Sequence, residues 1–521
     1  MLGVIGSNPI FSTDMKSFLL SFPFLLGVFF AFAQNTDEGD KPAKKAQVMT
    51  SVKADSSVTR HEMIIKGQHI SYKAVAGTEP VKDEDGKDIA SVFYTYYERT
   101  DVPNRNSRPL IISFNGGPGS ASVWMHIAYT GPKVLNIDDE GFPVQPYGTK
   151  DNPNSLLDVA DIVFIDPVNT GFSRMASKDV PRSKFFGVNS DIKYLAEWLN
   201  TFVGKYNKWT NPKFLIGESY GTTRVSGLAL ELQNNQWMYL NGVVLVSPTY
   251  LGIERGGVIE AANRLPYFAA TAWYHKMLPS DLQQKDLTEM LPEVEAFTIN
   301  ELIPALSKGS MLDAAKRNEI AAKMARYSGL PEKSILNHNL VISTSFFWKE
   351  LLRDKGYTLG RLDSRYLGID AEEAGENPDY NAELSSWLHS FTPAINAYLR
   401  QDLNYKTDLK YNMFGPVYPW DYTGANTDNT AANLRLAMAE NPYLHLLVQS
   451  GYYDGSICDF FDAKYSMWHI DPSGRMNDRM SWKGYRSGHM MYLRKQDLVT
   501  ATDDLREFIR KALPLDKPAK Y

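Results

Sequence analysis

The chain of 521 residues is long enough for one large domain with an insertion, or for two or three domains. Its composition is that of a globular protein, with 43% hydrophobic and 22% charged residues. The net charge of -5 at pH 7, without any cluster of Lys and Arg, offers no electrostatic basis for binding nucleic acid.

The first 33 residues have the pattern of a secretory signal peptide. Lys16 precedes an apolar run over 18–32, and a small-x-small cleavage pattern occupies 31–33. A membrane anchor is the alternative, but the run is shorter than the roughly 20 residues that a spanning helix needs, and it contains Pro23. We therefore expect cleavage after residue 33 and export to the periplasm or the medium, without membrane attachment afterwards.

Cys458 is the only cysteine, so no disulfide can form within one chain. An exported protein without disulfides must depend on a large apolar core. This fits a bacterial protein better than one of the eukaryotic secretory lumen. No metal or cofactor site is indicated either, because His61-Glu62 is not followed by the second histidine of a zinc helix motif.

An α/β pattern begins in the first half of the chain. From about 60 to 100, short β-rich runs surround a turn signal at Asp85-Gly86. Four unbroken apolar runs then begin at residues 109, 161, 213 and 241, namely PLIISFNGG, DIVFIDP, KFLIGES and NGVVLVSP. Such runs are typical of strands buried on both faces of a parallel sheet. Helical patterns over 191–206 and 223–233 separate them, which predicts an α/β fold with a mostly parallel central sheet.

The pattern changes after Pro248. Residues 251–430 show helical periodicity and no clear buried-strand run, and a strand signal returns at YLHLLVQSG. An amphipathic helix is predicted over about 496–512. We therefore predict a signal peptide (1–33), a first core part (34–250), an inserted helical cap (251–430) and a second core part (431–521). The aromatic run over 411–424 either packs between cap and core or lines a substrate cleft.

Residues 217–221, GESYG, match the G-x-S-x-G pattern of a nucleophile elbow. A buried-strand run precedes the pattern and a helical pattern follows it, which is the strand, tight turn and helix that an elbow needs. An ordinary Gly-rich turn between strand and helix is the alternative. A serine hydroxyl is a weak nucleophile at neutral pH, so Ser219 needs a base, and the base needs an orienting acid.

The base and the acid are expected near the C-terminus, because the chain order in an α/β-hydrolase is nucleophile, acid, base. His445, His469 and His489 are the candidates for the base by position. His489 fits best, since it lies in a glycine-marked loop just before the last predicted helix, where this fold presents its base.

Asp454 is the candidate acid, because it directly follows a strand run in a turn-like stretch. Asp459 and Asp462 are nearby alternatives, although both are more readily interpreted as solvated charges on the helix that follows.

Five motifs occur in the order found in the serine carboxypeptidase family: FNGGPGSAS, FIDPVNTGFSR, GESYGTT, SGYYDGS and SGHMMY. The chain resembles a bacterial member of this family over about 110–250 and 440–495, and loosely across the helical insertion. The resemblance implies an α/β-hydrolase core with a helical cap, and removal of C-terminal residues from peptides. On the matching positions it implies Ser219 as nucleophile, His489 as base and Asp454 as its partner.

The Gly-rich motif supports the same chemistry. Acyl transfer needs two backbone N–H donors directed at the developing oxyanion. One comes from the residue after the serine, Tyr220, and the other from a loop after an earlier strand. The resemblance implies Gly117 as this second donor, and a tight turn stiffened by Pro118 is compatible with that role.

A carboxypeptidase must also recognise the free carboxylate of its substrate. In the family, a glutamate beside the nucleophile and the asparagine that opens the Gly-rich motif bind it, which implies Glu218 and Asn115 here, with Gly116 in the same subsite. Two carboxyl groups in contact share a proton, so such binding prefers acidic pH. The alternative is that Glu218 only braces the elbow. Tyr129 replaces a second glutamate of the family, and either donates its hydroxyl to the same anion or packs.

The predicted function is that of an exported serine carboxypeptidase acting on peptides with a free C-terminus. The missing second acid weakens the expectation of strict exopeptidase action. An esterase or acyltransferase is the second enzyme hypothesis, since a triad defines acyl chemistry but not the acceptor. A third hypothesis, a binding protein without catalysis, is disfavoured by the complete set of Ser219, Asp454 and His489. Neither the oligomeric state nor the preferred C-terminal residue is encoded in these patterns.

Overall fold

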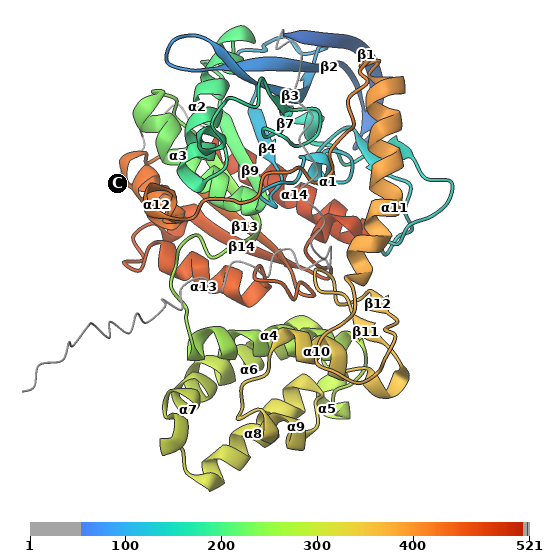
Figure 1. Cartoon of the computed structure of the whole chain (residues 1–521), viewed down its shortest axis with the longest axis vertical. Helices are drawn as coiled ribbons and strands as arrows, with labels where there is room; N and C mark the ends of the chain where they lie inside the picture. Colours follow the sequence, from blue (N-terminus) through green and yellow to red (C-terminus); the bar gives the residue numbers. More distant parts are fainter. Residues whose placement is uncertain (1–53, 514–517, 519–521) are drawn as a thin grey trace, which may run out of the picture. The chain divides into compact units, whose positions relative to one another are not determined.

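The structure, a computed structural model, describes residues 54–513 and residue 518, so the predicted signal peptide lies outside the described residues. The described part contains a 10-stranded sheet with the strand order β1-β2-β3-β7-β4-β9-β10-β13-β14, and β8 pairs with β3 (Figure 1). The strands are β1 (Asp55–Ile65), β2 (Gln68–Lys82), β3 (Asp88–Arg99), β4 (Leu110–Phe114), β7 (Asp161–Asp166), β8 (Arg174–Met175), β9 (Lys213–Ser219), β10 (Gly242–Pro248), β13 (His445–Gly451) and β14 (Met480–Tyr485). From β7 to β14 all neighbours in this order are parallel, which confirms the predicted α/β fold.

The central strands are buried on both faces, which explains their apolar sequences. Every residue of β4, β7 and β10 is buried. Successive side chains of a strand point to opposite faces, so Ile111 packs in one apolar cluster and its neighbour Ile112 in another. The four apolar runs that predict buried strands correspond to β4, β7, β9 and β10.

Helices cover both faces of this sheet. On one face, α2 (Val188–Lys205), α3 (Tyr220–Asn235) and α12 (Thr430–Glu440) share an apolar cluster with the strands. On the other face, α1 (Val123–His126), α11 (Ala382–Ala397) and α14 (Lys495–Ala512) do so. The helices predicted over 191–206, 223–233 and 496–512 correspond to α2, α3 and α14. None of the described helices is both long and apolar enough to cross a membrane.

The chain after β10 forms a helical layer with its own apolar cluster. Its helices are α4 (Val258–Tyr274), α5 (Ser280–Gln283), α6 (Leu287–Phe297), α7 (Ile303–Ser307), α8 (Ala314–Ser328), α9 (Glu332–Asn337) and α10 (Thr344–Glu350). The same cluster includes Tyr452, Tyr453, Phe460 and Phe461, which follow β13 in the chain. The helical layer therefore packs on the segment that carries Asp454.

The later part of the predicted cap packs with the core instead. Phe391 of α11 contacts Trp124 with ring centroids 4.5 Å apart, and both belong to the cluster on the α14 face. In the aromatic run over 411–424, Trp420 packs against Tyr220, 5.3 Å away. The layer that packs by itself thus ends well before residue 430, because helical periodicity indicates that a helix has an apolar face but not which surface covers it.

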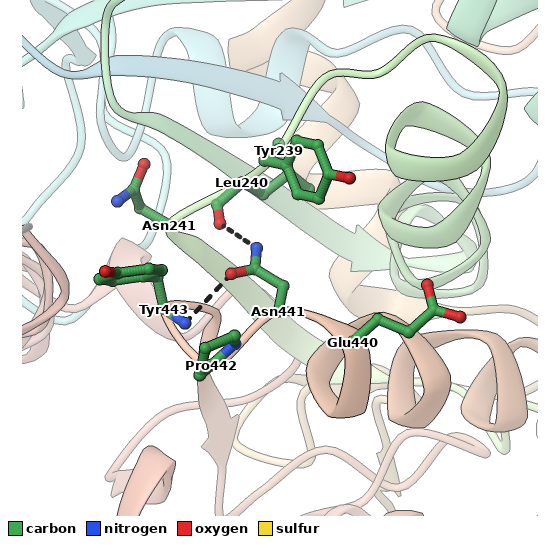
Figure 2. A pocket seen from close by; sticks show the side chains of 7 residues that line it. All are labelled: Tyr239, Leu240, Asn241, Glu440, Asn441, Pro442 and Tyr443. Atoms are coloured by element: carbon green, nitrogen blue, oxygen red, sulfur yellow. Dashed lines mark hydrogen bonds between the residues drawn. The ribbon is translucent and has the colours of Figure 1, made fainter. Parts of the chain in front are cut away.

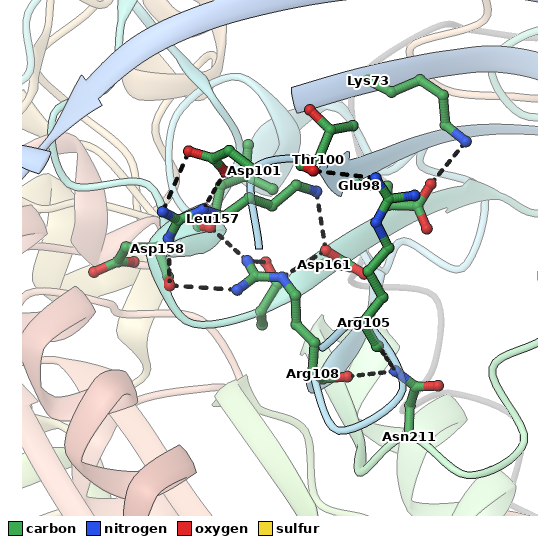
Figure 3. A network of polar contacts seen from close by, with 12 residues as sticks. Lys73, Glu98, Thr100, Asp101, Arg105, Arg108, Leu157, Asp158, Asp161 and Asn211 are labelled. Atoms are coloured by element: carbon green, nitrogen blue, oxygen red, sulfur yellow. Dashed lines mark hydrogen bonds and ion pairs between the residues drawn. The ribbon is translucent and has the colours of Figure 1, made fainter. Parts of the chain in front are cut away.

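A buried network of charges lies at the amino ends of the central strands (Figure 3). Asp161, at the start of β7, accepts hydrogen bonds from Arg108 Nε at 2.7 Å and Lys208 Nζ at 3.0 Å. Glu98 of β3 pairs with Lys208 at 3.2 Å and with Lys73 at 2.7 Å. Buried charges are tolerated when they are paired in this way. The network therefore has a structural role, and it connects strands at the end of the sheet opposite Ser219.

Candidate active site

The nucleophile elbow lies where β9 ends and α3 begins. Ser219 has φ 57° and ψ -128°, a backbone conformation that is rare for a residue with a side chain. A Cβ atom on Gly217 would lie 2.1 Å from Gly221 O, and one on Gly221 would lie 2.7 Å from Phe114 O. Only glycine fits at these two positions, because the turn is tight at Gly217 and Gly221 packs directly against the end of β4. Ser219 is partly exposed, whereas its neighbours Glu218 and Tyr220 are buried.

Asp454 and His489 form a buried pair at the carboxyl ends of β13 and β14. His489 Nδ1 lies 2.6 Å from Asp454 Oδ2, and the two residues are 6% and 0% exposed. Ser456 donates to the other oxygen of Asp454 from its N at 3.0 Å and its Oγ at 2.7 Å. Burial lowers the pKa of His489, but the charge and hydrogen bond of Asp454 outweigh it, so the pKa lies above its ordinary value. With Nδ1 donating to Asp454, Nε2 is the nitrogen left to accept a proton.

Two segments hold this pair against the end of β9. Leu362 O accepts from the backbone N of His489 at 2.7 Å, and Arg361 O accepts from Gly455 N at 3.0 Å. Ser247 Oγ donates to His489 O at 2.8 Å. Because β10 pairs directly with β9, this last bond brings the His489 loop to the elbow.

The Gly-rich loop lies directly against the elbow. A Cβ atom on Gly116 would lie 2.4 Å from Tyr220 N and 2.9 Å from Ser219 Cβ, so only glycine permits this approach. Gly117 has φ 104°, which favours glycine, and precedes a cis proline. The backbone of Gly116 and the N–H of Tyr220 are therefore adjacent, and Gly117, the predicted second donor, is the next residue of this loop.

A buried ion pair between α2 and α3 secures this loop. Arg224 Nε donates to Asp191 Oδ2 at 2.7 Å, and Arg224 Nη1 donates to Asn115 O at 2.7 Å. Both side chains of the pair are at most 1% exposed. This support could not be predicted from the sequence, because nothing in the spacing of these residues indicates that they meet.

Glu218 and Asn115, predicted as the carboxylate-binding pair, are in contact. Asn115 Nδ2 donates to Glu218 Oε1 at 2.8 Å, and Asn115 Oδ1 accepts from Met125 N at 3.2 Å, which orients the amide. Tyr492 OH donates to the other oxygen, Glu218 Oε2, at 2.5 Å. Burial raises the pKa of Glu218 to about 7, although the His489 charge and these two hydrogen bonds act in the opposite direction. Glu218 is thus a carboxyl group that changes protonation near neutral pH.

Tyr129 does not reach this pair. It is fully buried, and its hydroxyl donates to Gln449 Oε1 at 2.7 Å. Its ring stacks on that of Tyr492 with centroids 4.7 Å apart. Of the two predicted roles for Tyr129, the structure contradicts donation to the substrate carboxylate and agrees with packing. The hydroxyl beside Glu218 belongs instead to Tyr492, the last residue of SGHMMY, for which the sequence alone indicates no role.

The alternative bases lie elsewhere. His445 begins β13, at the end of the strand opposite Asp454. His469 lies on α13 (Phe460–Ile470), where its Nδ1 is 2.7 Å from the carbonyl of Tyr465 one turn earlier. Of the three histidines, only His489 has a carboxylate partner in a buried pair of this kind.

Asp459 and Asp462 are fully buried, so the prediction that they are solvated charges is wrong. Asp459 accepts from the backbone N of Asp462 and forms an ion pair with Arg264. Asp462 pairs with Arg264 at 3.4 Å and with Arg255 at 3.2 Å. The reason is tertiary: the helical layer brings these arginines onto the start of α13 and replaces the water that the isolated helix would have.

Two other features bear on the site. The thiol of Cys458 is in hydrogen-bonding contact with the side chains of Ser219 and Ser456, and burial raises its pKa. Among the residues that the structure describes, no group of three or more His, Cys, Asp and Glu side chains is arranged to hold a metal ion.

A surface cavity of about 400 Å³ lies away from this site (Figure 2). It is lined by Tyr239, Leu240, Asn241, Glu440, Asn441, Pro442 and Tyr443, which precede β10 and β13. The amide of Asn441 is bonded to Leu240 O and Tyr443 N, so it belongs to the wall of the cavity. Ligands of open α/β sheets bind at the carboxyl ends of the strands, and this cavity is at the amino ends.

Comparison with known proteins points to one family. The family model described as serine carboxypeptidase matches residues 67–342. Serine carboxypeptidase S10 family member 1 of Dictyostelium discoideum is 27% identical over 207 residues, covering 39% of this chain and 45% of the relative. The pheromone-processing carboxypeptidase KEX1 of Saccharomyces cerevisiae is 29% identical over 237 residues, covering 43% of this chain and 30% of the relative. The chain thus spans less than half of the length of these relatives.

The fold is similar to that of a solved relative. The crystal structure of KEX1(delta)p, a prohormone-processing carboxypeptidase from Saccharomyces cerevisiae, has a TM-score of 0.51 at 16% identity. The similarity covers 84% of this chain and 91% of that one. At 16% identity the structural similarity supports the fold alone, and membership of the family rests on the matched family model. The chain belongs to the serine carboxypeptidase family.

Proposed function

We propose that this protein is a serine carboxypeptidase that releases C-terminal residues from peptides through an acyl-enzyme. The observation that carries the proposal is the buried Asp454–His489 pair, 2.6 Å apart, which the bond from Ser247 ties to the strand beside the Ser219 elbow. A nucleophile, a base and an acid in this arrangement serve acyl transfer on many folds.

In the proposed reaction, Ser219 Oγ attacks the carbonyl carbon of the last peptide bond and His489 Nε2 takes its proton. Asp454 stabilises the imidazolium that forms. The N–H groups of Tyr220 and Gly117 bind the oxyanion. The C–N bond then breaks, His489 gives its proton to the leaving amino group, and water hydrolyses the acyl-enzyme with His489 as the base.

The proposed carboxylate subsite consists of Asn115, Gly116 and Glu218. A protonated Glu218 donates a hydrogen bond to the substrate carboxylate, whereas an ionised Glu218 repels it. Because burial raises the pKa of Glu218 to about 7, both forms are populated near neutral pH. Recognition of a free C-terminus is therefore expected to weaken as the pH rises through this range.

Hydrolysis of esters or acyl transfer to another acceptor is the second candidate. Both reactions would use the same three residues. The observation in its favour is that the partner of Glu218 is the Tyr492 hydroxyl rather than a second carboxyl group. We further propose that the protein is bacterial and exported, in the periplasm or the medium, on the pattern of residues 1–33.

The test combines active-site labelling with peptide digestion. A fluorophosphonate probe is expected to label Ser219, and the Ser219→Ala variant to take up none. Mass spectrometry of a digested free-acid peptide is expected to show stepwise loss of C-terminal residues, with slower loss from the same peptide carrying a C-terminal amide. Labelling of another residue would contradict the assigned nucleophile. Turnover of esters without turnover of any peptide would favour the second candidate.

A further inference from the structure

Both oxygens of the Glu218 carboxylate have a hydrogen-bond donor from the protein. Asn115 Nδ2 serves Oε1 at 2.8 Å, and Tyr492 OH serves Oε2 at 2.5 Å. Tyr492 lies three residues after His489, in the 3₁₀ turn η10 (Met491–Leu493) that leads into α14. The same loop therefore supplies the proposed base and the partner of the proposed carboxylate-binding acid.

The Tyr492 ring is fixed in place by its surroundings. It is 1% exposed and stacks on Tyr129 at an interplanar angle of 10°. The Tyr129 hydroxyl is itself bonded to Gln449 of β13, and Gln449 Nε2 donates to Tyr485 OH at 2.7 Å. A buried, stacked ring has little rotational freedom, so the Tyr492 hydroxyl is presented to Glu218 in a single geometry.

The groups that act on Glu218, two charged and two neutral, come from three other segments. His489, from the loop after β14, favours the ionised carboxylate, and Asp454, from the turn after β13, disfavours it. Asn115, after β4, is a neutral donor, and so is Tyr492, since burial raises its pKa well above the ordinary value and the phenol keeps its proton. A tyrosine in this position donates to an ionised carboxylate at any physiological pH, whereas a second carboxyl group would share its proton only at acidic pH.

We propose that Tyr492 is a positioning residue of the carboxylate subsite: its hydroxyl holds Glu218 against Asn115 and favours the ionised form of that carboxylate. Tyr492 thereby sets the pH above which a free C-terminus is no longer recognised. This inference rests on the proposed carboxypeptidase function, and it assigns the control of pH range to a residue that acts only through Glu218.

Tyr492→Phe tests this directly, because it keeps the stacked ring and removes only the donor. Loss of a hydrogen bond to a buried carboxylate raises its pKa, so the alkaline limb of kcat/KM on a free-acid peptide is expected to move up by about one pH unit. On the C-terminally amidated peptide the pH profile should not move. Tyr129→Phe is the matched control, because it removes a hydroxyl from the same stack that is bonded to Gln449 and not to Glu218, and its alkaline limb should stay in place.

Two further variants make the test decisive. In a Glu218→Gln background, Tyr492→Phe should add no shift, because the group that titrates is gone. A fluorinated tyrosine at position 492 is a stronger donor of nearly the same size, so it should move the limb to lower pH. This opposite shift remains measurable even if Tyr492→Phe does not fold. Infrared titration of the buried carboxyl group in Ser219→Ala should show the same directions without turnover.

Parallel profiles for wild type and Tyr492→Phe on the free-acid peptide would overturn the inference, as would an equal shift in Tyr129→Phe. Neither result would affect the labelling of Ser219 or the release of C-terminal residues by the wild type. Failure of the proposed function is distinguishable, since the wild type itself would then release no residues from free-acid peptides, and the inference would fall with it.

Discussion

Asp454→Asn is the substitution that tests the proposed chemistry most sharply. Asp454 is fully buried, lies 2.6 Å from His489 Nδ1, and is held by two bonds from Ser456. The asparagine can keep the bonds from Ser456 only by turning its NH₂ group towards His489. Nδ1 must then accept, which places the proton on Nε2, and a protonated Nε2 cannot take the proton of Ser219.

The expected loss in kcat is about four orders of magnitude, which corresponds to about 5 kcal/mol of lost transition-state stabilisation. A second effect has a defined sign. Without the charge of Asp454, burial dominates and the pKa of His489 falls. The acid limb of kcat/KM reports the deprotonation of the histidine in the free enzyme, so this limb should move to lower pH in the variant.

The assay is kcat/KM against pH on an amidated peptide, on which Glu218 has no carboxylate to bind, together with the rate at which a fluorophosphonate labels Ser219. A thermal melt of wild type and variant at one pH serves as the control for folding. A loss of less than tenfold in a folded variant, or an acid limb that stays in place, would refute the assignment of Asp454 as the partner of His489.

Three more outcomes are expected. Glu218→Gln should flatten the alkaline limb on a free-acid peptide, because an amide donates at every pH whereas the carboxyl loses its proton near pH 7; profiles parallel to wild type would make Glu218 a brace only. Asp161→Asn leaves Arg108 and Lys208 buried without their shared carboxylate, and should lower the free energy of unfolding by about 3 kcal/mol in urea denaturation. Labelling of Ser219 should stay unchanged at urea concentrations below the unfolding transition. His469→Ala should leave turnover within twofold of wild type, and a large loss would mean that the base has been misassigned.

The nucleophile elbow was predictable because its requirements are local. The steric limit at Gly217 arises within five consecutive residues, and the strand before Ser219 and the helix after it follow from hydrophobic periodicity. The order of Ser219, Asp454 and His489 along the chain was predictable for a related reason, since each directly follows or lies near the end of a strand of one parallel sheet. These features needed no knowledge of which helix packs where.

Tertiary structure alone decided the second partner of Glu218. Tyr492 lies 274 residues from it in the chain, and no periodicity or motif indicates that their side chains meet. The choice between the two predicted roles of Tyr129 has the same origin, since the sequence left both open and only the structure places its hydroxyl on Gln449. A sequence shows which side chains carry donors, acceptors and charge. Where those groups point depends on the packing of every element around them.

The same division holds for the fold as a whole. The apolar runs of β4, β7, β9 and β10 by themselves determined a buried parallel sheet, because a strand covered on both faces must be apolar throughout. The helical periodicity of residues 251–430, which include α11, also indicated helices with apolar faces. Only the tertiary structure decided that the apolar face of α11 packs on the core rather than in the helical layer, because apolar burial is non-directional and favours whichever matching surface the chain brings within reach.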